Sequence, residues 1–265
     1  MTWKLVSQSF RILRNDPKLL LFPVLSAIGV VALSVPFFLA LFGLHIADGL
    51  HFDRWGASSW LLVLLWYWGA AFVTVFFNCA LAACVQMQFA GQEPTIGEGL
   101  SRAVSRIHVI LAWSLVSASV GRILELIQSR SGLVGRIVVM FVGMGWSLAT
   151  FLIVPVVVME EQGVMDSIRR SAALLRQTWG EQIISGFAFG WIGLLFAIPG
   201  VVLGALGVNG YPIFLVPTVL WFAALIAAFA AASEIFTVVL YRYATSGQAP
   251  DGYDAATLNG AFKRR

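Results

Sequence analysis

The chain has 265 residues, of which 59% are hydrophobic and only 11% are charged, and its formal net charge is +4. Soluble domains carry about a quarter charged residues, so this composition excludes an ordinary water-soluble domain and favours a bilayer as the solvent. No basic patch is interleaved with aromatic residues, so we expect no nucleic-acid partner.

The sequence shows no pattern for covalent, metal or catalytic chemistry. The two cysteines, Cys79 and Cys84, lie five residues apart in one apolar segment. On a helix they point to different faces, so no disulfide is expected. No nucleophile elbow, metalloprotease helix or phosphate-cradling loop occurs. We therefore expect no cofactor, no metal and no catalytic residue, and we interpret the protein as a non-enzyme.

Six segments are long and apolar enough for membrane-spanning helices, which need about 20 residues each. In chain order they are Leu19–Leu44, Trp60–Gln88, Ile107–Ile127, Ile137–Met159, Ile183–Leu206 and Ile213–Tyr241. The fifth and sixth are joined by "GALGVNGYP", whose Gly and Pro residues indicate a tight turn. The sequence therefore predicts an all-α membrane protein with six transmembrane helices arranged as three hairpins.

The basic residues predict how these spans are oriented. Of the 17 Lys and Arg residues, four flank the predicted spans on one side, which leaves thirteen on the side that holds both chain ends. The four are Arg54, Arg122, Arg130 and Arg136. Because basic residues concentrate in cytoplasmic segments, we expect a multi-pass protein of the cell inner membrane with both termini in the cytoplasm.

A charged segment, "MDSIRRSAALLRQTWGEQ", separates the fourth and fifth spans. Apolar residues recur in it at steps of three or four: Val164, Ile168, Ala172, Leu175 and Trp179. This spacing predicts a helix with one apolar face. We expect the helix to lie in the cytoplasmic interface, with arginines beside that face reaching toward lipid phosphates.

Weaker copies of this segment, "SQSFRILRNDPKLL" and "GEGLSRAVSRIHVI", precede the first and third spans. Superposing the three copies aligns Phe10, Leu100 and Ile168. The candidate lipid-phosphate contacts on the second and third copies are Arg102, Arg106, Arg169, Arg170 and Arg176. We interpret residues 1–265 as one membrane domain in which a short cytoplasmic interfacial amphipathic helix precedes each hairpin.

The three units that this pattern defines are residues 1–90, 91–159 and 160–244, and residues 245–265 form a cytoplasmic tail. Internal repeats are common in membrane transport folds. Unrelated amphipathic helices placed before spans would share the same pattern, so both a true triplication and a chance likeness fit the sequence.

Glu234 is the sharpest candidate for a site within the membrane. It precedes Arg242 by eight residues, about 12 Å along a helix, which places a carboxyl group deep in hydrocarbon. An ionisable residue at that depth is a functional-site hypothesis by default, and burial favours its protonated form. The bland alternative is a neutral Glu hydrogen-bonded inside the bundle. Asn78 falls opposite Glu234 in the repeat alignment and is the expected partner.

Two further groups lie on the predicted outer side. Arg122 and Glu125, three residues apart, predict a local pair at the interface, with an anion gate as the functional alternative. Four residues of types that bind zinc share one loop: His45, Asp48, His51 and Asp53. Because no recognised ligand spacing connects them, we expect a solvated loop and not a metal site.

Three stretches resemble a known protein family: "LRNDPKLLLFPVLS", "DSIRRSAALLRQTWGEQ" and "LYRYATSGQAPDGYDAATLNGAF". They are similar to an uncharacterised family of prokaryotic six-span membrane proteins, a domain of unknown function. A looser likeness connects the chain to the membrane domain of some glycerophosphodiester phosphodiesterases. A third, to a sulfate-channel family, rests on "LLLFP". The main resemblance implies a fold and a membrane location but assigns no site residues.

Two functions fit these observations best. The first is a non-enzymatic membrane module that engages anionic lipid on its cytoplasmic side, or a protein partner such as a second copy or another membrane protein. The alternative is a small transporter or channel with a pathway between hairpins near Asn78 and Glu234. A transporter should carry a polar stripe along several spans, and most of these have almost none. An intramembrane lipid enzyme would need convergent titratable groups, and only Glu234 is clear.

Overall fold

The computed structural model describes residues 2–45, 56–178, 187–209, 211–250 and 253. The helices in this part of the chain are α1 (Thr2–Asn15), η1 (Pro17–Leu20), α2 (Leu21–His45), α3 (Ala57–Phe89), α4 (Ile96–Ser105), α5 (Ile107–Arg130), α6 (Leu133–Ala149), α7 (Ile153–Met159), α8 (Val164–Thr178), α9 (Phe187–Val208), η4 (Pro212–Phe214) and α10 (Leu215–Ser246). The described residues contain no β-strand, so the predicted all-α class is confirmed for them.

Five helical segments of the described chain are long and apolar enough to cross a membrane: 17–43, 58–89, 107–130, 134–159 and 212–246. Their large apolar side chains lie on the outside, and Leu39, Phe141 and Val219 are 68%, 63% and 67% exposed. Exposing apolar surface to water costs about 25 cal/mol per Å², so this surface fits lipid. The protein is therefore a helical, multi-pass membrane protein.

These five segments match the predicted first four spans and the sixth. The predicted fifth span begins at Ile183, and residues 183–186 lie outside the described part. In the part of the predicted fifth span that the structure describes, Gly193–Val208 of α9 forms an apolar helix that is shorter than the other five segments.

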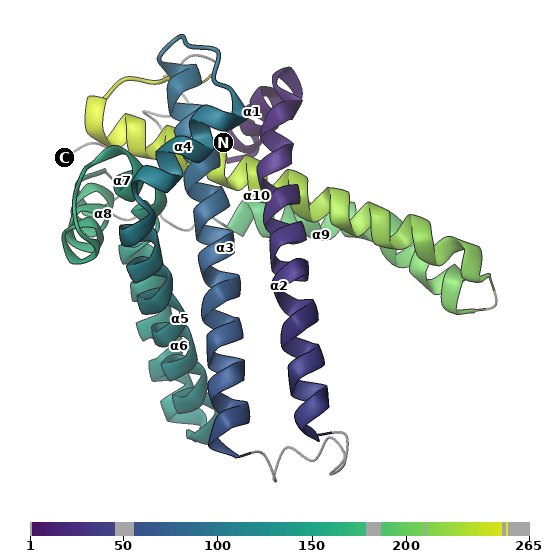
Figure 1. Cartoon of the computed structure of the whole chain (residues 1–265). Helices are drawn as coiled ribbons and strands as arrows, with labels where there is room; N and C mark the ends of the chain where they lie inside the picture. The colour runs from purple at the N-terminus through teal and green to yellow at the C-terminus, as the bar shows by residue number, and fades with distance from the viewer. Residues whose placement is uncertain (1, 46–55, 179–186, 210, 251–252, 254–265) are drawn as a thin grey trace.

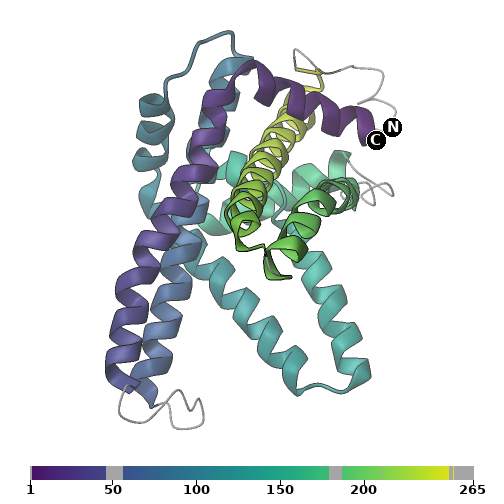
Figure 2. The same ribbon diagram turned by 90° about the vertical axis from the view of Figure 1, so that its right-hand side faces the viewer.

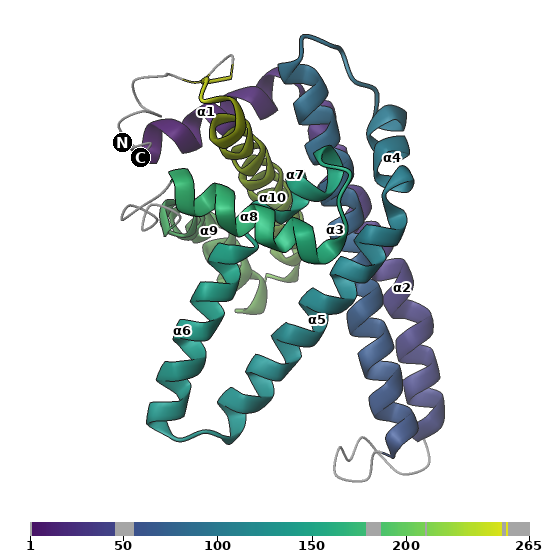
Figure 3. The ribbon, with the colours of Figure 1, turned by 90° about the vertical axis from the view of Figure 1, so that its left-hand side faces the viewer.

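The long helices are arranged as pairs. Helices α2 and α3 lie side by side (Figure 1), and the contact is close because a Cβ atom on Gly69 would lie 2.8 Å from Leu33 Cδ2. Helices α5 and α6 meet at Ser131–Gly132 (Figure 3). The pair α9–α10 runs across the direction of α2 and α3 in Figure 1, and Figure 2 shows it foreshortened. Among the described residues the long helices therefore form three pairs, and the α9–α10 pair is not aligned with α2 and α3.

The predicted fourth span is interrupted between α6 and α7. Pro155 lies in the first turn of α7, and it has no N–H to continue the helical ladder from α6. The backbone N–H of Leu152, inside this break, donates instead to the hydroxyl of Ser171 on α8 at 3.1 Å. The break is therefore stabilised by a neighbouring helix that the chain reaches only after α7.

The buried core lies at the end of the bundle that contains α1, α4, α7 and α8, which we call the proximal end (Figure 3). The opposite end, with Ser131 and Gly132, is the distal end. Residues 79–85 of α3 are buried, as is most of α10 from Ala231 to Tyr243, whereas the first half of α10 is largely exposed. Many of the core residues are small, so the helix backbones approach closely.

Helix α4 shows how the sequence builds this end. Its first turn is closed by a capping box, in which Thr95 Oγ1 accepts from Glu98 N at 3.2 Å and Glu98 Oε2 accepts from Thr95 N at 2.7 Å. These donors lower the pKa of Glu98. One turn later, Gly99 faces α3, and a Cβ atom there would lie 2.8 Å from the carbonyl oxygen of Ala80.

The three helices expected to lie in the membrane interface each bury one face against protein. Helix α1 buries Val6, Ser9 and Leu13. Helix α8 buries two serines and two leucines: Ser167, Ser171, Leu174 and Leu175. Of the predicted apolar face of α8, Leu175 is buried, and Val164 and Ile168 are partly buried and pack against the core. Trp179 lies outside the described residues.

Residue 253, which follows α10, is also fixed to the proximal end. Tyr253 is buried, and its hydroxyl lies 2.5 Å from the hydroxyl of Ser9 on α1. Burial raises the pKa of the Tyr253 phenol well above its usual range, so this group stays neutral.

The predicted threefold repeat stays a prediction, and most of the predicted cytoplasmic tail lies outside the described residues.

Candidate functional site

Glu160, the residue after α7, accepts hydrogen bonds from three side chains. Nε of Arg170 on α8 lies 3.0 and 2.9 Å from its two carboxylate oxygens. The hydroxyl of Tyr241 on α10 donates to Oε1 at 3.1 Å, and Gln162 Nε2 donates to Oε2 at 3.2 Å. We call these four residues the Glu160 cluster. The cluster connects α7, α8 and α10 through one carboxylate, whose side chain is 17% exposed.

Arg106, between α4 and α5, binds the carbonyl groups at the end of α7. Its Nε donates to the carbonyl of Val157 at 3.0 Å, and its Nη2 donates to those of Gln162 at 2.7 Å and Glu160 at 3.3 Å. A cation suits a helix C-terminus, where unpaired carbonyls carry partial negative charge. Arg106 and Arg170 were both expected to contact lipid phosphates, and in this structure both bind protein groups.

The other three arginines predicted to contact lipid phosphates have side chains exposed at the surface of the structure. Arg102 on α4 and Arg169 and Arg176 on α8 are exposed. Arg169 lies 3.5 Å from Asp166, and both side chains are largely exposed, so this pair contributes less than about 1 kcal/mol. Within the described part of the chain, the guanidinium groups of Arg102 and Arg176 form no hydrogen bond or ion pair.

Two more exposed arginines, which the sequence did not single out as site residues, lie on α1. Arg11 and Arg14 are separated by one turn, and Ser7 precedes Arg11 by four residues, so the three share one side of the helix. Neither arginine side chain forms an ion pair or hydrogen bond with another described residue. The sequence feature that could have identified Arg11 and Arg14 as candidate site residues is their position on the polar face of the first amphipathic segment.

Glu234 is buried, with 8% of its surface exposed, in the half of α10 that packs into the core. Its Oε1 has no hydrogen-bond partner among the described residues. The half-buried Asn78 on α3 therefore does not supply the predicted bond to that oxygen. The structure thus places a carboxyl oxygen in an apolar core without a partner, and its protonation stays a prediction.

Arg122 and Glu125 form an ion pair near the end of α5, with Nη1 and Oε2 2.5 Å apart. The guanidinium of Arg122 also lies over the ring of Tyr67 on α3, 5.7 Å from its centre. Glu125 is 64% exposed, so the pair is a surface feature that adds little stability. A role as a gate stays a prediction.

The predicted outer loop lies mainly outside the described residues. Asp48, His51 and Asp53 fall in that part, and the side chain of His45 does too. Across the residues that the structure describes, no group of three or more His, Cys, Asp or Glu side chains is placed to hold a metal ion.

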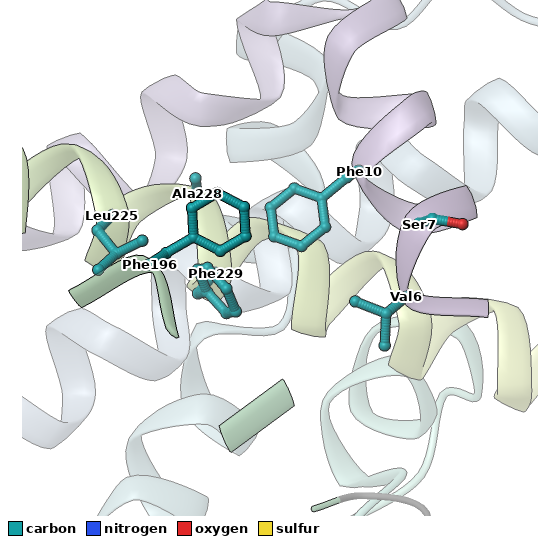
Figure 4. A pocket seen from close by; sticks show the side chains of 7 residues that line it. All are labelled: Val6, Ser7, Phe10, Phe196, Leu225, Ala228 and Phe229. Atoms are coloured by element: carbon teal, nitrogen blue, oxygen red, sulfur yellow. The ribbon is translucent and has the colours of Figure 1, made fainter. Parts of the chain in front are cut away.

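An apolar groove of about 390 Å³ lies between α1, α9 and α10 (Figure 4). Its walls are Val6 and Phe10 of α1, Phe196 of α9, and Leu225, Ala228 and Phe229 of α10. The rings of Phe10 and Phe229 meet edge to face, with centres 5.1 Å apart. Ser7 is the only polar residue among the described residues that line it. We call it the α1 groove.

A second, more polar cavity of about 490 Å³ lies between α3, α4, α7 and α10. Gln86, Arg102, Tyr241 and Thr245 are among the residues that line it. Gln86 Oε1 is buried there without a hydrogen-bond partner in the described part of the chain. Because the C-terminal ends of α3, α7 and α10 all lie at this cavity, their partial negative charges offset that of Arg102. The electrostatics of this cavity therefore favour neither an anionic nor a cationic ligand.

A family model, "Family of unknown function (DUF6159)", matches residues 57–251, which is more than half of the chain. The chain belongs to this family. The DUF6159 match contains "DSIRRSAALLRQTWGEQ" whole but begins after "LRNDPKLLLFPVLS". No curated protein and no solved structure matches the chain. Membership of DUF6159 agrees with the expected likeness to a family of unknown function. The looser likeness to phosphodiesterase membrane domains and the prokaryotic source stay predictions.

Proposed function

We propose that this DUF6159 protein is a non-enzymatic module of the cell inner membrane that engages anionic lipid at its proximal end. In this proposal the proximal end is cytoplasmic, because thirteen of the 17 Lys and Arg residues belong to that side in the sequence. In this proposal α9 supplies the predicted fifth span and pairs with α10 as the third hairpin.

The observation that carries the proposal is the set of exposed arginines on α4 and α8. Arg102, Arg169 and Arg176 all lie at the proximal end, and none is held by a buried protein partner. A Lys or Arg close to an anionic membrane surface contributes about 1 kcal/mol. Arg106 and Arg170 are left out of the proposed lipid contacts because Nε and Nη2 of Arg106 donate to the backbone at the end of α7 and Nε of Arg170 donates to Glu160.

Lipid-dependent stability of the purified full-length protein tests this function. We expect added phosphatidylglycerol to raise the midpoint of thermal unfolding more than added phosphatidylcholine does. The triple variant Arg102→Gln, Arg169→Gln, Arg176→Gln should lose most of that difference. A matched control, Arg130→Gln with Arg136→Gln, removes exposed charges at the distal end and should retain it. Equal shifts with both lipids, or an equal loss in the control, would contradict the proposal.

A second candidate function, proton or cation transport, is favoured by one observation, the buried Oε1 of Glu234 without a partner. A carboxyl group at such a position can exchange a proton with a pathway between hairpins. Glu234→Gln keeps the shape of the side chain but cannot exchange a proton. Reconstituted vesicles with the wild-type protein should then carry a proton flux that the variant lacks. The absence of flux in both would remove this candidate.

A further inference from the structure

The α1 groove lies between α1, near the start of the chain, and the consecutive helices α9 and α10, and its lining is almost entirely apolar (Figure 4). The ring of Phe10 on α1 points toward the rings of Phe196 on α9 and Phe229 on α10, and Leu225 lies farther from Phe10 (Figure 4). Its volume of about 390 Å³ lies within the range of roughly 300–1,000 Å³ that small-molecule sites occupy. The groove is therefore large enough for part of a lipid but has no group to recognise a polar ligand.

The border of this groove on α1 changes abruptly from apolar to basic. Ser7 lines the groove, and Arg11 and Arg14 continue the same side of the helix by one and two turns. Both arginines are exposed, and neither has a carboxylate partner within the described residues. An apolar groove beside two uncompensated cations matches an amphiphile that has an apolar tail and an anionic head.

We propose that the α1 groove holds one acyl chain of an anionic phospholipid, with Arg11 and Arg14 contacting its phosphate. This inference rests on the proposed function and gives it a specific lipid site, separate from the arginines of α4 and α8. The two charges of one sign favour a lipid over an apolar helix from another protein or a second copy. A helix in the groove would leave both cations unpaired at its edge.

Photocrosslinking in nanodiscs tests the site with the full-length protein. The probe is phosphatidylglycerol with a photoreactive group midway along one acyl chain, diluted into phosphatidylcholine, and crosslinked peptides are identified by mass spectrometry. We expect crosslinks to the segments of α1 and α10 that line the groove. A phosphatidylcholine carrying the same photoreactive chain should label them less.

Two variants separate the tail from the head. Ala228→Phe fills the groove, whereas Ala230→Phe adds the same ring on an exposed face of α10 and serves as the control. The pair Arg11→Gln with Arg14→Gln removes the proposed phosphate contacts without changing the groove. At about 1 kcal/mol for each charge, this pair should lower crosslinking of the anionic probe by roughly tenfold or more. Ala228→Phe should abolish it, and Ala230→Phe should not change it.

The outcomes distinguish this site from the broader function. Undiminished crosslinking in both Ala228→Phe and the Arg11–Arg14 variant would overturn the α1 groove as the site. Stabilisation by phosphatidylglycerol could still persist in that case and would leave the proposed function standing. Equal labelling by both probes would show ordinary bilayer lipid in the groove, and crosslinks between two copies of the chain in place of lipid would show a protein occupant. Either result would also overturn the inference.

Discussion

Arg170 Nε lies within hydrogen-bonding distance of both carboxylate oxygens of Glu160, at 3.0 and 2.9 Å, and so ties α8 to the end of α7. Because the Glu160 side chain is mostly buried and also accepts from Tyr241, losing its charge leaves several donors with a weaker acceptor. Hydrogen bonds to charged groups contribute about 1.5–3 kcal/mol, and partial exposure of Arg170 reduces this.

We therefore predict that Glu160→Gln lowers the free energy of unfolding by about 1–2 kcal/mol. The neighbouring Glu161 is exposed, so Glu161→Gln should stay within about 0.5 kcal/mol of the wild type. Chemical unfolding in detergent, followed by circular dichroism, measures both. Equal effects of the two substitutions would show that the Glu160 cluster does not stabilise the fold.

The fork of Arg106 leads to a second prediction. Its nitrogen atoms reach three carbonyl groups at the end of α7, and a lysine, with a single ammonium group, cannot reproduce that geometry. Arg106→Lys should lower the free energy of unfolding by about 1.5–3 kcal/mol. Arg102→Lys, four residues earlier and exposed, should be nearly neutral in the same unfolding experiment. A neutral Arg106→Lys would remove the assigned role.

Two glycines of α4 are predicted to respond in opposite directions. At Gly99, a Cβ atom would collide with Cys84 Sγ and lie 2.8 Å from the carbonyl oxygen of Ala80, whereas at Gly97 it would meet only Thr95 Oγ1 at 3.9 Å. Gly99→Ala should destabilise by about 1–3 kcal/mol through overpacking. Gly97→Ala should stabilise the helix by up to about 1 kcal/mol. Thermal unfolding of both variants checks this, and a stable Gly99→Ala would contradict the close packing of α4 on α3.

Orientation can be tested with single cysteines at the two ends of the bundle. Gly132, at the distal end, is exposed, and a Cβ atom added there would have no other atom within 4 Å. Gln248, which follows α10, is also exposed. The native Cys79 and Cys84 are buried and give the background. In intact cells an impermeant maleimide should label Gly132→Cys and not Gln248→Cys. The reverse pattern would show that the proximal end faces outward.

Apolar runs predict most of the long helices closely because a spanning helix is defined by length and composition alone. The second predicted span, Trp60–Gln88, corresponds to α3 at Ala57–Phe89, and the third starts at the same residue, Ile107, as α5. The direction of the α9–α10 pair could not be predicted. It depends on which half of α10 is buried in the core, and its apolar residues are distributed along the whole helix.

The candidate site was harder to predict than the fold. The sequence places Arg106 and Arg170 beside an apolar face, but it does not show that one meets the end of α7 and the other meets Glu160. Both partners come from a segment that adjoins a break in the predicted fourth span, and the break results from Pro155 and Ser171 together. The burial of Glu234 could be predicted because an ionisable side chain in the middle of a long apolar helix is rare and stands out in the sequence.

The most direct test of the central proposal is an experimental density map of the protein in nanodiscs that contain phosphatidylglycerol. The proposal predicts lipid density at the proximal end, with phosphate groups within hydrogen-bonding distance of Arg102, Arg169 or Arg176. Arg106 should remain on the carbonyl groups at the end of α7 in the same map. A map in which those exposed arginines contact only solvent, while ordered phosphate groups gather at the distal end, would contradict it.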